Sequence, residues 1–303
     1  MDRAALYAEK VLSAGNLNTT NSTLSAERLI NAGNINVNGA LTVDLRNAED
    51  GDVNVGDITG ADGATVTFHT KYDKGNGTTG KGTTRLSPKT GGTGTLTISN
   101  VLLNFEDTDA IFDSGIAFTN TQIKTNLGGY SSVRFINNTF NGNNIITADS
   151  ITANSLVVSA NSRLTLKNLD GAGNGLLNGN LTVNDGGAFT GNLIGDLNLY
   201  GHFTGDMQGD IRVLTDHDWS FNGKFNGNIE ATFKDSVFDT TCLKLAQGST
   251  IGSLTLMRAY DSKSADVIVN SDLAVSNLFL TIRERNSPGQ ILKTPEKSQE
   301  RER

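Results

Sequence analysis

The sequence predicts an all-β fold: a right-handed parallel β-helix (β-solenoid) with coils of about 18–22 residues. Two observations predict this fold: a motif recurs at a fixed interval, and the amino-acid composition is unusual. The chain of 303 residues contains 34 Gly and 34 Asn, but only 3 Pro and 6% aromatic residues. Gly and Asn favour tight turns, and the short aliphatic runs between them are typical of β-strands. The composition therefore indicates many short strands joined by turns.

The opening motif repeats after 18 residues. AEKVLSAGNLN begins at Ala8, and AERLINAGNIN begins at Ala26. A partial third copy, Gly51-Asp-Val-Asn-Val, continues the interval between Gly15 and Gly33. Polar and apolar residues alternate in the later copies, which is the period of a strand and not of a helix. Three sides of about six residues each would complete one turn of a solenoid.

Further repeats follow with less regular spacing. Gly-x-Leu-Thr recurs at Gly39, Gly94, Gly179 and Gly252. Three phenylalanines, Phe189, Phe203 and Phe221, are each followed by Gly two and six residues later. Successive turns of a solenoid lie about 4.8 Å apart, so we expect equivalent aliphatic and Phe side chains to stack into one core. Gly should form the corners, and Asn side chains should hydrogen-bond along the stack.

We expect residues 1–282 to form one β-helical domain. Within it, residues 71–94 are rich in Gly, Thr and Lys and are predicted to protrude as a loop. Residues 283–303 contain ten charges and two prolines, a composition typical of a disordered tail. The hand of the coil follows the general preference of parallel crossovers for the right-handed form.

The charge and the termini exclude some function classes. A net charge of -7 leaves no broad basic surface for nucleic acid. The N-terminus has no basic region followed by an apolar run, so it does not resemble a signal peptide, and no run is long enough for a transmembrane helix. The single cysteine, Cys242, cannot form an intrachain disulfide, and we interpret it as a small buried residue.

One stretch partly matches a phosphate-binding loop. Residues 75–82 fit the pattern Gly-x-x-x-x-Gly-Lys, with Lys81 as the lysine. Gly82 occupies the position where such loops carry the Ser or Thr that binds magnesium, and the residues that follow cannot form the required helix. We therefore interpret it as a Gly/Thr loop and assign no cofactor site.

Two acidic stretches are candidate calcium sites: residues 47–57 (NAEDGDVNVGD) and 105–115 (FEDTDAIFDSG). Their spacing matches neither the EF-hand nor the tandem nonapeptide loop, so solvated turns are favoured. His69 and His202 are isolated residues in predicted strands, and no spacing links them to a shared metal. No metal site is assigned.

Some β-helical proteins cleave polysaccharides with clustered carboxylates, so one polar cluster is a candidate catalytic site. Its members are Asp210, Arg212, Asp216, His217, Asp218 and Trp219. Strand alternation would place Asp216 and Asp218 on one face and His217 on the other. Trp219 would be either a sugar platform or a packed corner. A non-catalytic interpretation is favoured, and no catalytic residue is assigned.

Three runs carry a family resemblance: NAGNINVNGALTVDL, SVRFINNTFNGNNIITADSITANSLVVSANSRLTLKNL and GLLNGNLTVNDGGAFTGNL. They resemble the passenger domains of Gram-negative autotransporters, and FINNTFNGNN is closest in style to the vacuolating-cytotoxin-like autotransporters. The resemblance implies a secreted or surface-displayed β-helical rod that acts in adhesion, host interaction or toxin delivery. It rests on repeat style, so it transfers no site residues.

The expected function is therefore that of a non-catalytic rod at the bacterial surface or in the medium, with a host-cell surface or extracellular ligand as its partner. Membrane contact by a toxin-like rod and head-to-tail association of coil ends are further expectations. Because such autotransporters also carry a signal sequence and a C-terminal barrel, the chain is predicted to be a segment of one. The alternative is a β-helical carbohydrate-active enzyme or a phage tail-spike-like protein.

Overall fold

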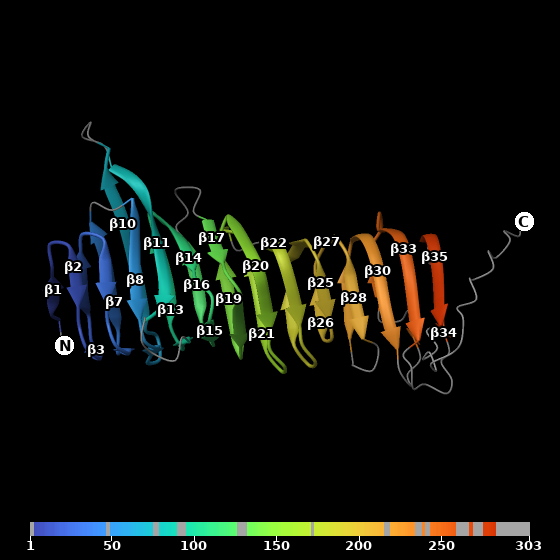
Figure 1. The fold of residues 1–303 in the computed structure, drawn as a ribbon, viewed down its shortest axis with the longest axis horizontal. Helices are drawn as coiled ribbons and strands as arrows, with labels where there is room; N and C mark the ends of the chain where they lie inside the picture. Colours follow the sequence, from blue (N-terminus) through green and yellow to red (C-terminus); the bar gives the residue numbers. More distant parts are fainter. Residues whose placement is uncertain are drawn as a thin grey trace, which may run out of the picture.

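The structure is a computed structural model, and it describes residues 3–46, 49–74, 79–89, 95–125, 132–170, 173–214, 219–233, 238–239, 243–258, 267–268 and 275–282. All regular elements in these residues are β-strands, and nearly all of them pair in parallel. They wind into a β-solenoid, a rod with its N-terminal turns at one end and β35 at the other (Figure 1). The described part of the chain includes no helix with the length and hydropathy needed to cross a membrane.

The rod has three sides, each a parallel sheet that gains one strand from every turn. Side 1 consists of β1 (Ala5–Tyr7), β4 (Ser22–Ala26), β7 (Ala40–Arg46), β10 (Thr65–Asp73), β13 (Leu102–Glu106), β16 (Gln122–Thr125), β19 (Asn143–Thr147), β21 (Arg163–Lys167), β23 (Ala188–Thr190), β26 (His202–Thr204), β29 (Ser220–Gly223) and β32 (Leu243–Leu245).

Side 2 follows side 1 in every turn. It consists of β2 (Val11–Ser13), β5 (Leu29–Asn31), β8 (Asp50–Val55), β11 (Thr79–Pro88), β14 (Thr108–Phe112), β17 (Ser132–Phe135), β24 (Asn192–Ile194), β27 (Met207–Gln208) and the first parts of β20 (Ser150–Val158), β22 (Leu176–Val183), β30 (Phe225–Phe233), β33 (Thr250–Arg258) and β35 (Val275–Ile282). The second parts of those five long strands continue into side 3, because the chain turns this corner within a strand.

Side 3 completes the turn. Besides those second parts it contains β3 (Leu17–Thr19), β6 (Ile35–Val37), β9 (Ile58–Gly60), β12 (Leu96–Ser99), β15 (Ile116–Thr119), β18 (Asn138–Asn141), β25 (Leu197–Leu199) and β28 (Ile211–Leu214). A separate pair is formed by β31 (Phe238–Asp239) and β34 (Val267–Ile268).

The first turns confirm the strand interpretation of the opening motif. Ala5 pairs with Thr23, Val11 with Leu29, and Leu17 with Ile35, so each side advances by the same 18 residues. The sequence AEKVL, which read alone could begin a helix, contributes strand β2. Alternation places one set of side chains inside and the next outside, as the burial of β7 shows residue by residue.

The alignment of the third copy was wrong. Gly51-Asp-Val continues the sequence interval, but Val53 pairs with Ile30 and therefore lies on side 2. The residue that stacks on Ile35 is Ile58, and the amide of Gly56 donates to the carbonyl of Gly33. The chain adds residues at β7 and its corner before it returns to side 3. The third structural copy is thus Gly56-Asp-Ile, five residues later than predicted.

Coil length varies more than the expected 18–22 residues. Leu193 pairs with Met207, only 14 positions later, whereas Ile58 pairs with Ile98, 40 positions later. The longest turn includes part of the segment predicted to protrude as a loop. There β10 extends to Asp73 and pairs antiparallel with the start of β11, and in Figure 1 β10 rises above its neighbours. From Thr83 onward β11 pairs in parallel with β8 and belongs to side 2. Residues 75–78, 90–94 and the predicted tail 283–303 lie outside the described residues.

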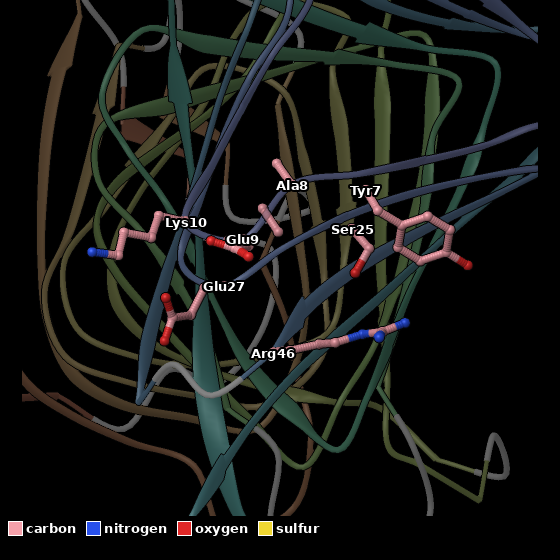
Figure 2. A pocket seen from close by; sticks show the side chains of 8 residues that line it. Tyr7, Ala8, Glu9, Lys10, Ser25, Glu27 and Arg46 are labelled. Carbon is pink, nitrogen blue, oxygen red and sulfur yellow. The ribbon is translucent and has the colours of Figure 1, made fainter.

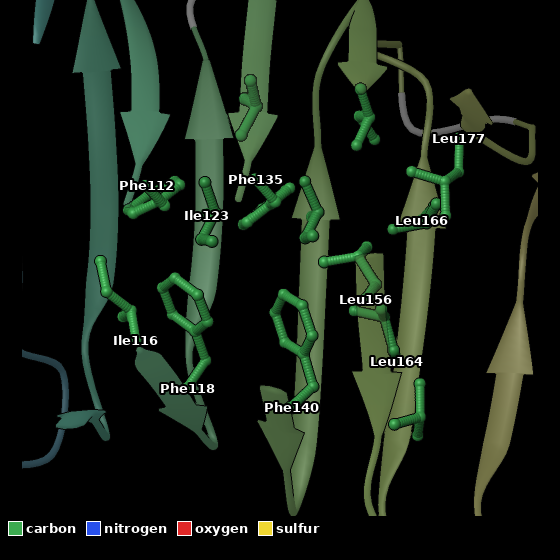
Figure 3. Packing of buried hydrophobic residues seen from close by; sticks show 14 of the residues in the cluster. Phe112, Ile116, Phe118, Ile123, Phe135, Phe140, Leu156, Leu164, Leu166 and Leu177 are labelled. Carbon is green, nitrogen blue, oxygen red and sulfur yellow. The ribbon is translucent and has the colours of Figure 1, made fainter. Parts of the chain in front are cut away.

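Inside the coil, equivalent side chains stack as predicted. Phe112 and Phe135 stack at 5.1 Å between ring centroids, and Phe118 and Phe140 at 4.9 Å, with the pairs meeting edge to face (Figure 3). Each pair joins partners in adjacent strands, so the strand register fixes the aromatic stack. One continuous apolar core results, and it holds the outward side chains of each turn at fixed positions.

Candidate functional site

Many Asn and Asp side chains at the corners bind the backbone of the next turn. The Asn16 Oδ1 accepts the Asn34 amide at 2.9 Å, the Asn34 Oδ1 accepts the Asp57 amide at 3.1 Å, and the Asp57 Oδ1 accepts the Thr97 amide at 2.8 Å. This ladder satisfies backbone groups that a corner would leave unpaired. The Asn residues of the opening motif therefore build the coil, as the sequence predicted.

The aspartates of the acidic stretch 105–115 form ion pairs with Lys and Arg side chains of the preceding turn. Lys71 Nζ lies 2.8 Å from Asp107, Lys81 Nζ 2.8 Å from Asp109, and Arg85 Nε 3.0 Å from Asp113. In the other stretch Asp57 belongs to the corner ladder. Among the described residues no three His, Cys, Asp or Glu side chains come together as a metal site.

The phosphate-loop pattern falls on a hairpin. Gly80 and Lys81 belong to β11 and lie opposite Tyr72 and Lys71 of β10. Since Gly82 continues the same strand, no helix N-terminus follows to hold phosphates. Residues 75–78 of the pattern lie outside the described residues.

The structure describes only part of the polar cluster that was a catalytic candidate, because residues 215–218 lie outside the described ranges. The Asp210 Oδ1 accepts the amide of Asn228 at 3.2 Å and its side-chain Nδ2 at 2.9 Å, which is a corner role. Arg212 points outward on side 3. Trp219 is 4% exposed and packs in the core, so it is a packed corner and offers no ring face to a sugar.

The two described histidines have separate partners on side 1. His69 Nε2 lies 3.7 Å from Glu106 Oε2, and His202 Nδ1 lies 2.9 Å from the Ser220 Oγ. Cys242 lies outside the described residues. Among the predicted polar residues, Asp57, Asp107, Asp109, Asp113 and Asp210 therefore bind the backbone or a cation of a neighbouring turn.

One candidate site is an open hollow of about 550 Å³ at the N-terminal corner between sides 1 and 2 (Figure 2). We call it the corner hollow. Its lining comes from the first three turns: Tyr7, Ala8, Glu9, Lys10, Ser25, Ala26, Glu27 and Arg46. The small side chains of Ala8, Ser25 and Ala26 leave the space that the longer side chains surround.

A tyrosine and an arginine form one wall of the corner hollow. Tyr7 is 63% exposed, and the guanidinium carbon of Arg46 lies 5.4 Å from the centre of its ring, a cation–π contact. Asp44, two residues earlier on β7, accepts a hydrogen bond from Arg46 Nε at 2.6 Å. This bond and the charge of Asp44 raise the pKa of Arg46 above its usual value, and the bond orients the guanidinium.

The opposite wall carries two carboxylates, Glu9 and Glu27, from equivalent positions of the first two turns. Neither forms an ion pair within the described part of the chain. The hollow thus presents an aromatic face, a guanidinium, the ammonium group of Lys10 and two carboxylates without ion pairs to one ligand. That combination suits recognition of a polar ligand with both hydroxyl and charged groups.

The sequence interpretation did not single out these residues. The repeats Ala8-Glu-Lys and Ala26-Glu-Arg could have shown that the two carboxylates stack. No sequence signal links Arg46 to Tyr7, because their contact spans two turns of the coil. No protein-family model matches the chain, and no curated protein or solved structure is significantly similar to it.

Proposed function

We propose that this chain is a non-catalytic binding rod of the kind found in autotransporter passengers, secreted or displayed on a bacterial surface, with an extracellular or host-surface ligand. The corner hollow carries the proposal. Tyr and Arg are among the side chains enriched at binding hot spots, and here Asp44 holds Arg46 against the Tyr7 ring before any ligand arrives.

Several other polar residues in the described part of the chain stabilise the scaffold. Asp210 caps a corner, and Trp219 packs inside the coil. The aspartates of residues 105–115 pair with cations of the neighbouring turn. These groups stabilise a rigid scaffold, on which a site formed by the first three turns keeps its geometry.

The test is binding of the fluorescently labelled chain to cultured host cells. Wild-type chain should bind saturably, and the double variant Tyr7→Ala/Arg46→Ala should lose at least about tenfold in affinity, the size of a hot-spot contribution. Arg163→Ala, which removes an exposed arginine from a distant turn of the same side, is the matched control. Absence of saturable binding, or an equal loss in the control, would overturn the proposal. Leakage of liposomes on addition of the chain would instead favour a toxin-like rod.

A further inference from the structure

The charged side chains that line the corner hollow are two cations and two anions. Lys10 and Arg46 are positive, and Glu9 and Glu27 are negative. An acidic ligand would be attracted by the first pair and repelled by the second, and a basic ligand would meet the reverse. The hollow therefore favours a ligand without net charge, and it disfavours nucleic acid, acidic polymers and strongly basic protein segments.

The same four side chains divide into hydrogen-bond donors and acceptors. A carboxylate only accepts, and an ammonium or guanidinium group only donates. Glu9, Glu27 and Lys10 form no ion pair within the described part of the chain. Arg46 uses its Nε for Asp44 and has further N–H groups. Because a hydroxyl group both donates and accepts, a ligand with several hydroxyl groups can bond to all four side chains, and bonds to charged groups are the stronger kind.

Tyr7 supplies an apolar surface beside these polar groups. Its side chain is 63% exposed, more than any other large apolar side chain that the structure describes. The guanidinium carbon of Arg46 lies 5.4 Å from the ring centre, a contact that restrains the ring. A sugar ring has hydroxyl groups at its rim and C–H groups on its faces. It can therefore stack on the tyrosine while its hydroxyl groups reach the charged side chains.

The shape of the corner hollow suits a polar ligand. Its floor includes the small side chains of Ser25 and Ala26, both buried. Its volume of about 550 Å³ is within the usual range of small-molecule sites. The hollow is open, so a bound ligand keeps part of its surface in water. A hydroxyl-rich chain tolerates this contact with water, whereas an apolar ligand would remove little of its surface from water and gain little by binding.

We propose that the ligand of the corner hollow is a hydroxyl-rich carbohydrate chain without net charge. This assignment rests on the binding role proposed above for the hollow and specifies its ligand. One sugar ring stacks on Tyr7. Its hydroxyl groups donate hydrogen bonds to Glu9 and Glu27, and its oxygen atoms accept hydrogen bonds from Lys10 and Arg46.

The test uses an array of immobilised neutral, carboxylated and sulfated oligosaccharides, probed with the labelled full chain. Wild-type chain should bind neutral oligosaccharides, and raised ionic strength should change this binding little because the ligand is uncharged. Tyr7→Ala should weaken binding at least about tenfold, whereas Tyr7→Phe keeps the ring and should retain most of the affinity. Val11→Ala, which truncates an exposed side chain of β2 outside the hollow, is the matched control and should bind normally. Unchanged circular dichroism would confirm that the variants fold.

Three outcomes on the array would overturn the assignment: no binding to any oligosaccharide, preference for the carboxylated or sulfated chains, or equal binding by wild-type and Tyr7→Ala chains.

Cultured host cells separate this assignment from the proposed binding role. Mild periodate oxidation, which cleaves the vicinal diols of cell-surface sugars, should abolish the binding of wild-type chain. Saturable binding that survives periodate but is lost in Tyr7→Ala/Arg46→Ala would refute the carbohydrate, assign the hollow to a protein ligand and leave the binding role intact. Binding of neutral oligosaccharides without saturable binding to cells would refute the host-cell role and uphold the carbohydrate.

Discussion

Phe203 and Phe221 stack face to face, with ring centroids 5.1 Å apart and ring planes inclined by 4°. They are partners in adjacent strands of side 1, and Phe189 continues the stack on the other side of Phe203 at 5.2 Å. All three side chains are buried. Phe203 therefore packs against the turn before it and the turn after it, and its removal should weaken the packing of both turns.

Phe203→Ala should therefore lower the free energy of unfolding by about 3–5 kcal/mol, the usual cost of truncating a buried phenylalanine. Urea denaturation followed by circular dichroism would measure it. Phe203→Leu keeps most of the volume and should cost distinctly less. Equal stability of the alanine variant and the wild type would show that the stack is not part of a tight core.

Gly205 occupies a corner that admits no side chain. Its φ is 142°, a region that only glycine adopts readily, and a β-carbon there would overlap the carbonyl oxygen of Gly191 in the preceding turn. Gly205→Ala should cost about 1–3 kcal/mol from backbone conformation alone, and the overlap should add to it.

Gly15→Ala is the matched control for that substitution. Gly15 has open space where a β-carbon would lie, so the change in unfolding free energy should stay within about 1 kcal/mol and could be favourable. The melting temperatures of the two variants would separate them. Similar melting temperatures would refute the close backbone approach at Gly205.

The Asn16 side chain should protect the Asn34 amide, which donates to its Oδ1. Asn16→Ala should cost about 0.5–1.5 kcal/mol, and exchange of the Asn34 amide hydrogen should accelerate by roughly 2- to 12-fold. Asn16→Asp retains an acceptor oxygen and should preserve the protection. Unaltered exchange in Asn16→Ala would mean that this hydrogen bond does not stabilise the corner.

Trp219 is the only tryptophan in the chain, so its fluorescence reports on one place. Because the indole is buried, its emission should be shifted to shorter wavelength than in the denatured chain, and acrylamide should quench it several-fold less. Added polysaccharide should leave the emission unchanged. A red-shifted emission that polysaccharide alters would restore the sugar-platform interpretation.

The strand period, the three-sided turn and the stacking of Phe189, Phe203 and Phe221 were predictable because they depend on local properties. A side chain in a strand alternates between inside and outside whatever the rest of the chain does. Asn at the corners was also predictable: Asn21 and Asn120 adopt φ values of 48° and 50°, a conformation that Asn tolerates better than most residues.

Register was not predictable in the same way. Gly51 and Gly56 both open a Gly-Asp-aliphatic stretch, and sequence spacing favoured Gly51. The coil selected Gly56, because residues added at β7 widen one corner while the inter-turn hydrogen bonds and the buried aliphatic column continue without a break. For the same reason the sequence predicts a loop at residues 71–94. The strand partners of β11 are β8 and β14, in the preceding and following turns, and the local sequence does not show them.

The sequence by itself determined that this protein is a coil of short parallel strands with Gly and Asn corners, since those choices follow from neighbouring residues. Only the tertiary structure decided which turns stack, and it thereby created the corner hollow. Arg46 meets Tyr7 two turns away. Which residues become neighbours depends on the number of residues in each turn. That number is fixed by the inter-turn hydrogen bonds and the buried core, and both form only when the whole coil folds.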